Sequence, residues 1–205
     1  MKLKKHFVVS VVVLISLAAC SLPIAAGKKP TAQLISKNES TKQAAFQDAM
    51  RKLWEDHITW TRVFIISAVS DLPDKAVATD RLLQNQVDIG NAIKPYYGNA
   101  AGEKLTTLLK EHITTAAEIV AAAKAADKPK QDDATKRWFA NADQIAIFLS
   151  DANTKNWPRA EMQKMMHDHL DLTTQEVVAR LQGNWVADIA AYDKVHEQIY
   201  RWPIC

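Results

Sequence analysis

The sequence predicts an all-α protein, an up-and-down bundle of about six helices built as three similar helical hairpins. Apolar residues recur at alternating spacings of three and four residues along most of the chain, which is typical of helices with one buried face. The chain has only 5 glycines in 205 residues, too few for a turn-rich β-fold. No stretch of useful length alternates with a period of two residues, so we expect no sheet.

The first 20 residues resemble a bacterial lipoprotein export signal. Lys2, Lys4 and Lys5 precede an apolar stretch over residues 7–17 that is too short to span a bilayer. The stretch ends in the sequence LAAC at residues 17–20, which resembles the lipobox. We therefore expect residues 1–19 to be removed and Cys20 to be lipidated, which would hold the protein at the extracytoplasmic face of the cell membrane. The alternative is an ordinary secretory peptide with an incidental cysteine.

Residues 20–41 are expected to form a lipidated tether, because they contain Pro23, Gly27 and Pro30 and lack helical periodicity. Residues 42–205 then form the helical-bundle domain. Removal of the three signal-peptide lysines from the 26 basic residues leaves 23, equal to the 23 acidic residues. A neutral mature chain argues against a nucleic-acid partner. Cys205 has no internal partner once Cys20 is acylated, so no disulfide is expected.

The first hairpin is expected to consist of helices at about 41–69 and 75–94. Pro73 separates them, and Pro95 ends the second helix because proline interrupts the backbone hydrogen bonding of a helix.

The second hairpin is expected at about 101–126 and 131–150. An alanine-rich run favours helix in its first half, and Pro129 suits the start of its second half.

The third hairpin is expected at about 158–181 and 184–201. Pro158 opens its first helix and Gly183 separates the two.

The hairpins also repeat one another weakly in sequence. Residues 53–59, 108–114 and 165–171 are similar, and each carries a histidine, at positions 57, 112 and 169. Spacings of 55 and 57 residues fit one helical hairpin as the repeating unit. The alternative is chance similarity between helices of like composition.

One polar residue interrupts the apolar face of each predicted helix. The midpoint in sequence between each successive pair of these residues falls on a predicted turn. In a bundle of antiparallel neighbours, all six should therefore lie at one level. They are His57, Gln86, His112, Asn141, His169 and His196.

Neutral imidazoles at one level of a bundle suit a transition-metal site for Zn, Fe, Cu or Ni. The candidate ligands are His57, His112, His169 and His196. Polar neighbours would surround and orient these ligands, namely Asp56, Gln86, Glu111, Asn141, Asp168 and Asp193. The pKa of each imidazole on an apolar face should fall below about 6.5.

Two other functions remain open. The layer can be a purely structural set of hydrogen bonds within a non-enzymatic interaction module of the cell envelope. An enzyme acting on a small envelope substrate in a polar core cavity is the third hypothesis. No familiar catalytic motif occurs, so no catalytic residue is predicted. Arg62 is expected to pair with a buried carboxylate or to bind an anion.

Two motifs carry a family resemblance. The sequence LWxDHxxWTR at residues 53–62 and the sequence NQxDIGxAIKPYYG at residues 85–98 resemble a group of small helical proteins of Gram-positive bacteria. The similarity runs from about residue 50 to residue 198. The resemblance implies no established activity.

Overall fold

The computed structural model describes residues 32–202, with their side chains from residue 41 onward. The predicted signal peptide, Cys20 and Cys205 lie outside the described residues. The described chain is all-helical and folds as a bundle of six helices, which confirms the predicted class. In chain order these are α1 (Ala32–Val69), α2 (Lys75–Tyr97), α3 (Asn99–Lys124), α4 (Lys128–Ala152), α5 (Arg159–Leu181) and α6 (Trp185–Tyr200).

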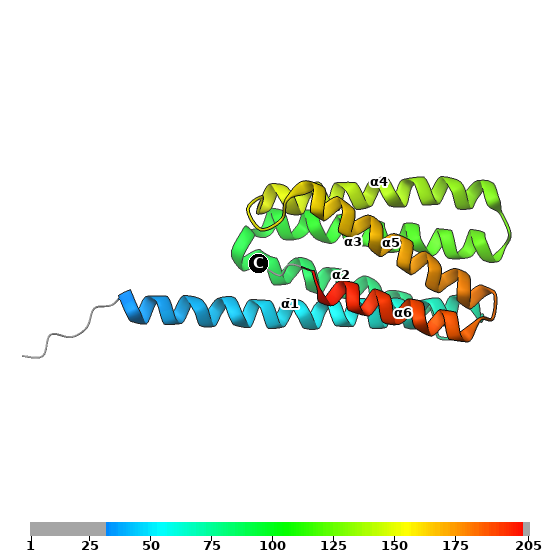
Figure 1. Cartoon of the computed structure of the whole chain (residues 1–205), viewed down its shortest axis with the longest axis horizontal. Helices are drawn as coiled ribbons and strands as arrows, with labels where there is room; N and C mark the ends of the chain where they lie inside the picture. Colours follow the sequence, from blue (N-terminus) through cyan, green and yellow to red (C-terminus); the bar gives the residue numbers. More distant parts are fainter. Residues whose placement is uncertain (1–31, 203–205) are drawn as a thin grey trace, which may run out of the picture.

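The helices form three hairpins, each of which packs against the next in chain order (Figure 1). The turns α1–α2, α3–α4 and α5–α6 all lie at one end of the bundle, which we call the three-turn end. Helix α5 crosses diagonally from α4 toward α1, and α6 returns along α1. The N-terminal part of α1 extends beyond the other helices at the opposite end. Among the described helices, none is long and apolar enough to cross a bilayer.

The helix boundaries differ from expectation in two places. Helix α1 begins at Ala32, nine residues before the expected start at residue 41. Helix α2 continues through Pro95 to Tyr97, because a proline in the last turn disturbs only the end of the hydrogen-bond ladder. Gly98 alone separates α2 from α3, and its φ of +85° is a conformation that favours glycine.

Local capping fixes the second and third hairpin turns. The Asp127 side chain accepts a hydrogen bond from the Lys130 amide at 3.2 Å, and Pro129 occupies the first turn of α4. The Asn184 side chain accepts from the Ala187 amide at 3.1 Å at the start of α6. These caps satisfy backbone N–H groups that have no partner inside the helix.

The apolar core has two parts. The larger part runs through the middle of the bundle and contains Trp54, Trp138, Leu170 and Trp202. A smaller cluster around Ile65 lies toward the three-turn end, between α1, α2, α3 and α5. The polar side chains described next lie within and beside this apolar core.

Candidate functional site

Three buried histidines occupy the middle of the bundle. His57, His112 and His169 lie on α1, α3 and α5, the first helix of each hairpin, and each residue is only 4–5% exposed. The ring centroids of His57 and His169 are 6.1 Å apart. His112 lies close enough to both others for their charges to repel on protonation. The structure therefore brings these three predicted residues together.

An amide side chain bridges the two helices of the second hairpin. The Nδ2 atom of Asn141 donates a hydrogen bond to the Leu108 carbonyl at 3.1 Å. The Asn141 Oδ1 atom therefore faces His112 Nδ1, 2.9 Å away. An amide oxygen only accepts, so His112 carries its proton on Nδ1.

The third hairpin repeats this arrangement. The Nε2 atom of Gln198 donates to the Met165 carbonyl at 2.7 Å, and its Oε1 atom lies 3.2 Å from His169 Nδ1. His169 is therefore also protonated on Nδ1.

The first hairpin uses two consecutive amides. The Nδ2 atom of Asn85 donates to the Leu53 carbonyl at 3.0 Å, and the Asn85 side chain hydrogen-bonds His57. The Nε2 atom of Gln86 donates to the Leu82 carbonyl at 2.8 Å and lies 3.3 Å from His57 Nδ1. In every hairpin the first-helix carbonyl that receives an amide N–H from the second helix lies four residues before the histidine. We call the three histidines and their amides Asn85, Gln86, Asn141 and Gln198 the histidine layer.

The three imidazoles are neutral at physiological pH. Burial, aided by repulsion from His169, lowers the pKa of His57 and of His112 to about 3. Burial lowers the pKa of His169 to about 4. In a neutral ring protonated on Nδ1, the lone pair lies on Nε2. Among the described residues, the hydrogen bonds of the His112 and His169 rings are made at Nδ1, which leaves their Nε2 atoms available.

The prediction that His196 belongs to this layer is wrong. Its side chain is 41% exposed, and its Nε2 atom lies 2.8 Å from Glu55 Oε1 on the outside of the bundle. Helix α6 instead turns Gln198, two residues later, into the layer. A signal for this was present in the sequence, because the histidine and its amide are 29 residues apart in all three hairpins.

The carboxylates expected to orient the imidazoles do not do so. Asp56 binds Lys52 at 2.6 Å and Asp168 binds Lys164 at 2.5 Å, both on their own helices. Glu111 and Asp193 are exposed. A residue next to an inward-facing histidine is rotated by about 100° around the helix, which here turns it to solvent. Among the described residues, no three His, Cys, Asp or Glu side chains stand ready to hold a metal ion.

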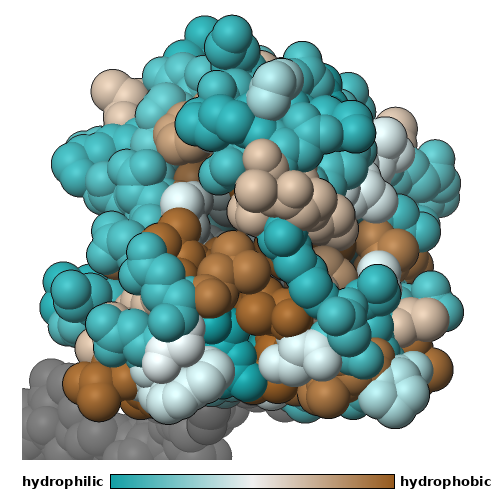
Figure 2. All heavy atoms as spheres, turned by 90° about the vertical axis from the view of Figure 1, so that its right-hand side faces the viewer, coloured by the Kyte–Doolittle hydropathy of each residue, from teal (hydrophilic) through white to brown (hydrophobic). Residues whose placement is uncertain are grey.

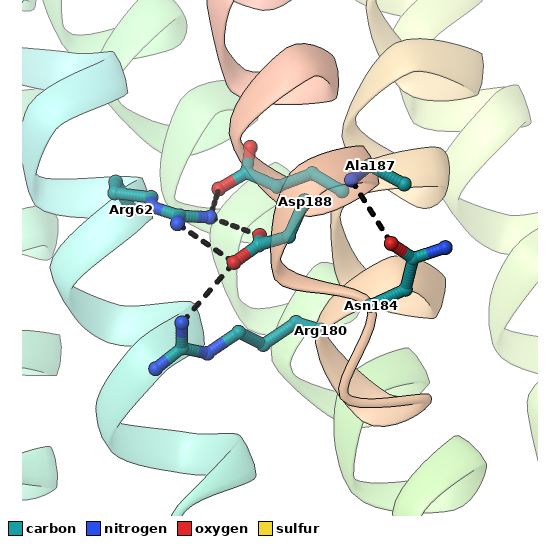
Figure 3. A network of polar contacts seen from close by, with 6 residues as sticks. Arg62, Arg180, Asn184, Ala187 and Asp188 are labelled. Atoms are coloured by element: carbon teal, nitrogen blue, oxygen red, sulfur yellow. Dashed lines mark hydrogen bonds and ion pairs between the residues drawn. The ribbon is translucent and has the colours of Figure 1, made fainter.

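A buried ion network joins three helices near the three-turn end (Figure 3). Arg62 on α1 contacts both carboxylate oxygens of Asp188 on α6, with Nη2 and Oδ2 2.8 Å apart, and Glu176 Oε1 on α5 at 2.8 Å. Arg180 on α5 contacts Asp188 Oδ2 at 3.1 Å. This confirms that Arg62 pairs with buried carboxylates, and we call these four residues the ion network.

The charges of the ion network balance. Burial raises the pKa of Glu176, although Arg62 opposes this. Burial also acts to raise the pKa of Asp188, but hydrogen bonds from Arg62 and Arg180 outweigh it, so that pKa is lowered. Tyr192 covers the Arg62 guanidinium at 5.5 Å, and Trp185 covers that of Arg180 at 4.8 Å. The network therefore fastens α1 to the third hairpin through paired charges, with only the buried Nε atom of Arg180 left without a hydrogen bond among the described residues.

Together the fold and the site define a class: a helical bundle of three hairpins with a neutral histidine layer and a buried ion network. No protein-family model, curated protein or solved structure matches this chain.

The histidine layer should make the fold sensitive to acid. The folded-state pKa values of about 3 to 4 lie below the unfolded value of about 6.5, so the unfolded chain binds more protons below pH 6.5. Each buried histidine should then lower the free energy of unfolding by roughly 1.4 kcal/mol per pH unit between about pH 6.5 and its folded pKa. Urea unfolding at several pH values should show this loss of unfolding free energy. In His112→Gln the loss should be smaller by about the contribution of one buried histidine. The variant His196→Gln, outside the layer, should keep the full loss, and an equal loss in all three proteins would contradict the assignment.

Removal of the central arginine of the ion network should be strongly destabilising. Arg62→Met leaves two buried carboxylates without their main cation, so the free energy of unfolding should fall by about 3–5 kcal/mol. The control is Arg137→Met, which removes an arginine that pairs with Glu118 and Asp133 on the surface and should cost less than about 1 kcal/mol. Similar losses in the two variants, measured by urea unfolding, would show that the network does not carry this stability.

Proposed function

We propose that this chain is a non-enzymatic binding module of the cell envelope, tethered to the membrane by lipid at Cys20, in which the histidine layer fixes the register of the three hairpins. The observation that carries the proposal is the repeated amide bridge. In each hairpin an amide on the second helix contacts a carbonyl on the first helix and the histidine four residues beyond it.

The amide bridges support a structural role because they can form in only one register. A shift of one helix by a single turn, about 5.4 Å, would part Asn85, Asn141 and Gln198 from both the carbonyl and the histidine that each contacts. A buried polar group that loses its partner costs about 1–3 kcal/mol. Three such bridges, one in each hairpin, therefore favour a single arrangement of the bundle.

The position of the chain ends supports a binding role away from the membrane. The described part of α1 extends beyond the bundle at the end opposite the three-turn end (Figure 1). A lipid tether that precedes α1 would leave the three-turn end facing away from the bilayer. That end is therefore the one best placed to meet a ligand or a partner.

A second candidate function is the binding of a transition-metal ion by His57, His112 and His169. The observation that favours it is the protonation of Nδ1 in His112 and His169, fixed by an amide oxygen, which leaves Nε2 of these two residues free as a ligand. Zn, Cu, Fe and Ni all accept imidazole, with Zn–N distances of about 2.0–2.1 Å. The three Nε2 atoms would have to converge on the ion by side-chain rotation.

One variant separates the two functions. Asn141→Leu keeps the branched shape of the side chain but removes both hydrogen bonds of its amide bridge. If the layer is purely structural, Asn141→Leu should lower the free energy of unfolding by about 1–3 kcal/mol in metal-free buffer. Zinc, copper, iron or nickel should then leave the melting temperature of the parent protein unchanged. Gln144→Leu, an exposed position on the same helix, is the control and should change little.

The opposite pattern would favour the metal. Stoichiometric metal in the purified parent, together with a rise in melting temperature that Asn141→Leu weakens, would establish the second candidate. Equal stability of Asn141→Leu and Gln144→Leu without any metal effect would overturn both.

The lipid tether is tested separately. Cys20→Ser should release the protein from the membrane or leave an unprocessed precursor, because the acylated residue is lost. Fractionation and intact-mass measurement report the outcome. Membrane attachment and mass unchanged in the variant would favour the ordinary secretory peptide or another anchor.

A further inference from the structure

An apolar cleft opens at the three-turn end of the bundle. It lies between the α3–α4 hairpin on one side and α1 and α5 on the other, and it narrows from an open mouth to an inner space of about 40 Å³. Figure 2 views the molecule from this end and shows apolar surface between polar rims. Its walls include Phe64, Ile65, Leu82, Ile119, Val120 and Val177. We call this the end cleft.

Two hydrogen-bonding groups of the end cleft have no partner among the described residues. Trp138 lines the cleft, is 4% exposed, and its buried Nε1–H makes no hydrogen bond. The Thr61 hydroxyl, on the α1 side of the cleft, is likewise buried and unpaired. Buried indole N–H groups usually have a partner. An acceptor that enters the cleft would supply one.

Neighbouring residues hold the Trp138 side chain in place. Its ring lies 5.2 Å from that of His112, and Asn141, one helical turn further along α4, is fixed by its amide bridge. The donor is therefore part of a rigid wall, which favours binding because little side-chain freedom is lost.

We propose that the end cleft binds the carbonyl end of an uncharged, mostly apolar molecule, such as a methyl ketone or an ester, whose apolar chain extends through the open mouth. The acceptor receives the Trp138 Nε1–H, and the Thr61 hydroxyl can donate or accept beside it. None of the described residues lining the cleft is charged, which disfavours an ionic ligand. A mostly apolar wall with few polar groups is the usual composition of a small-molecule site.

This inference deepens the proposed binding-module function and rests on it. Val178, which lines the cleft, is 39% exposed, so a ligand can enter from the end that faces away from the tether. The histidine layer can be structural even if the cleft binds nothing, and the two tests measure different signals.

The test compares 2-octanone with its hydrocarbon counterpart 2-methyl-1-octene, in which CH₂ replaces the carbonyl oxygen. Titration of the ¹⁵N-labelled mature domain reports on each tryptophan through its indole N–H signal. The ketone should shift the Trp138 signal saturably and bind about threefold to tenfold more tightly than the alkene, the contribution of one hydrogen bond. This comparison uses the unaltered domain and needs no variant to fold.

Two variants assign the donor. Trp138→Phe should abolish the preference for the ketone, whereas Trp185→Phe, at an exposed tryptophan outside the cleft, should keep it. The inference is overturned if the ketone causes no saturable shift, if ketone and alkene bind equally, or if the preference survives in Trp138→Phe. It is also overturned if the Trp138 signal depends on protein concentration alone, because a second copy of the chain would then occupy the cleft.

Discussion

The side chains of Asn141 and Gln198 each contact a backbone carbonyl and an imidazole at the same time. An amide has separate donor and acceptor ends, so the carbonyl determines which end meets the imidazole and thereby which ring nitrogen is protonated. The carbonyl belongs to the same helix as the histidine, one turn earlier. Each bridge therefore fixes the rotation and the height of two helices together. In the proposed structural role, the bridges select the register of the hairpins, whereas the apolar contacts of the core tolerate small shifts.

The protein core contains two groups of buried polar side chains, one neutral and one charged. The histidine layer is neutral, because burial lowers the pKa values of its imidazoles far below 7. The ion network is charged but balanced, with Arg62 and Arg180 opposite Glu176 and Asp188. Neutral groups need only hydrogen bonds when buried, whereas buried charges need partners of opposite sign. The histidine layer connects the two helices within each hairpin, and the ion network joins the third hairpin to α1.

The sequence was sufficient for the fold and for part of the layer. Apolar periodicity and proline positions predicted six helices, and equal distances from the turns placed His57, Gln86, His112, Asn141 and His169 correctly. The same arithmetic could not separate His196 from Gln198, because the midpoint with His169 falls in the α5–α6 turn for either residue. The choice depends on the rotation of α6 about its axis. The positions of the ion-network carboxylates and of the end cleft depend on how α5 crosses the bundle. No local sequence pattern predicts this crossing.

The histidine layer and the end cleft share a wall, and this links rigidity to binding. Trp138 contacts the ring of His112 on one side and lines the cleft on the other. His112 is held in turn by Asn141, which lies on the same helix as Trp138. Loss of the amide bridge would free both the imidazole and the α4 segment that carries the indole. A ligand that accepts the Trp138 Nε1–H would bind only the arrangement in which this segment is in place. By thermodynamic linkage, such a ligand would stabilise the layer by the same free energy that an intact layer contributes to ligand binding.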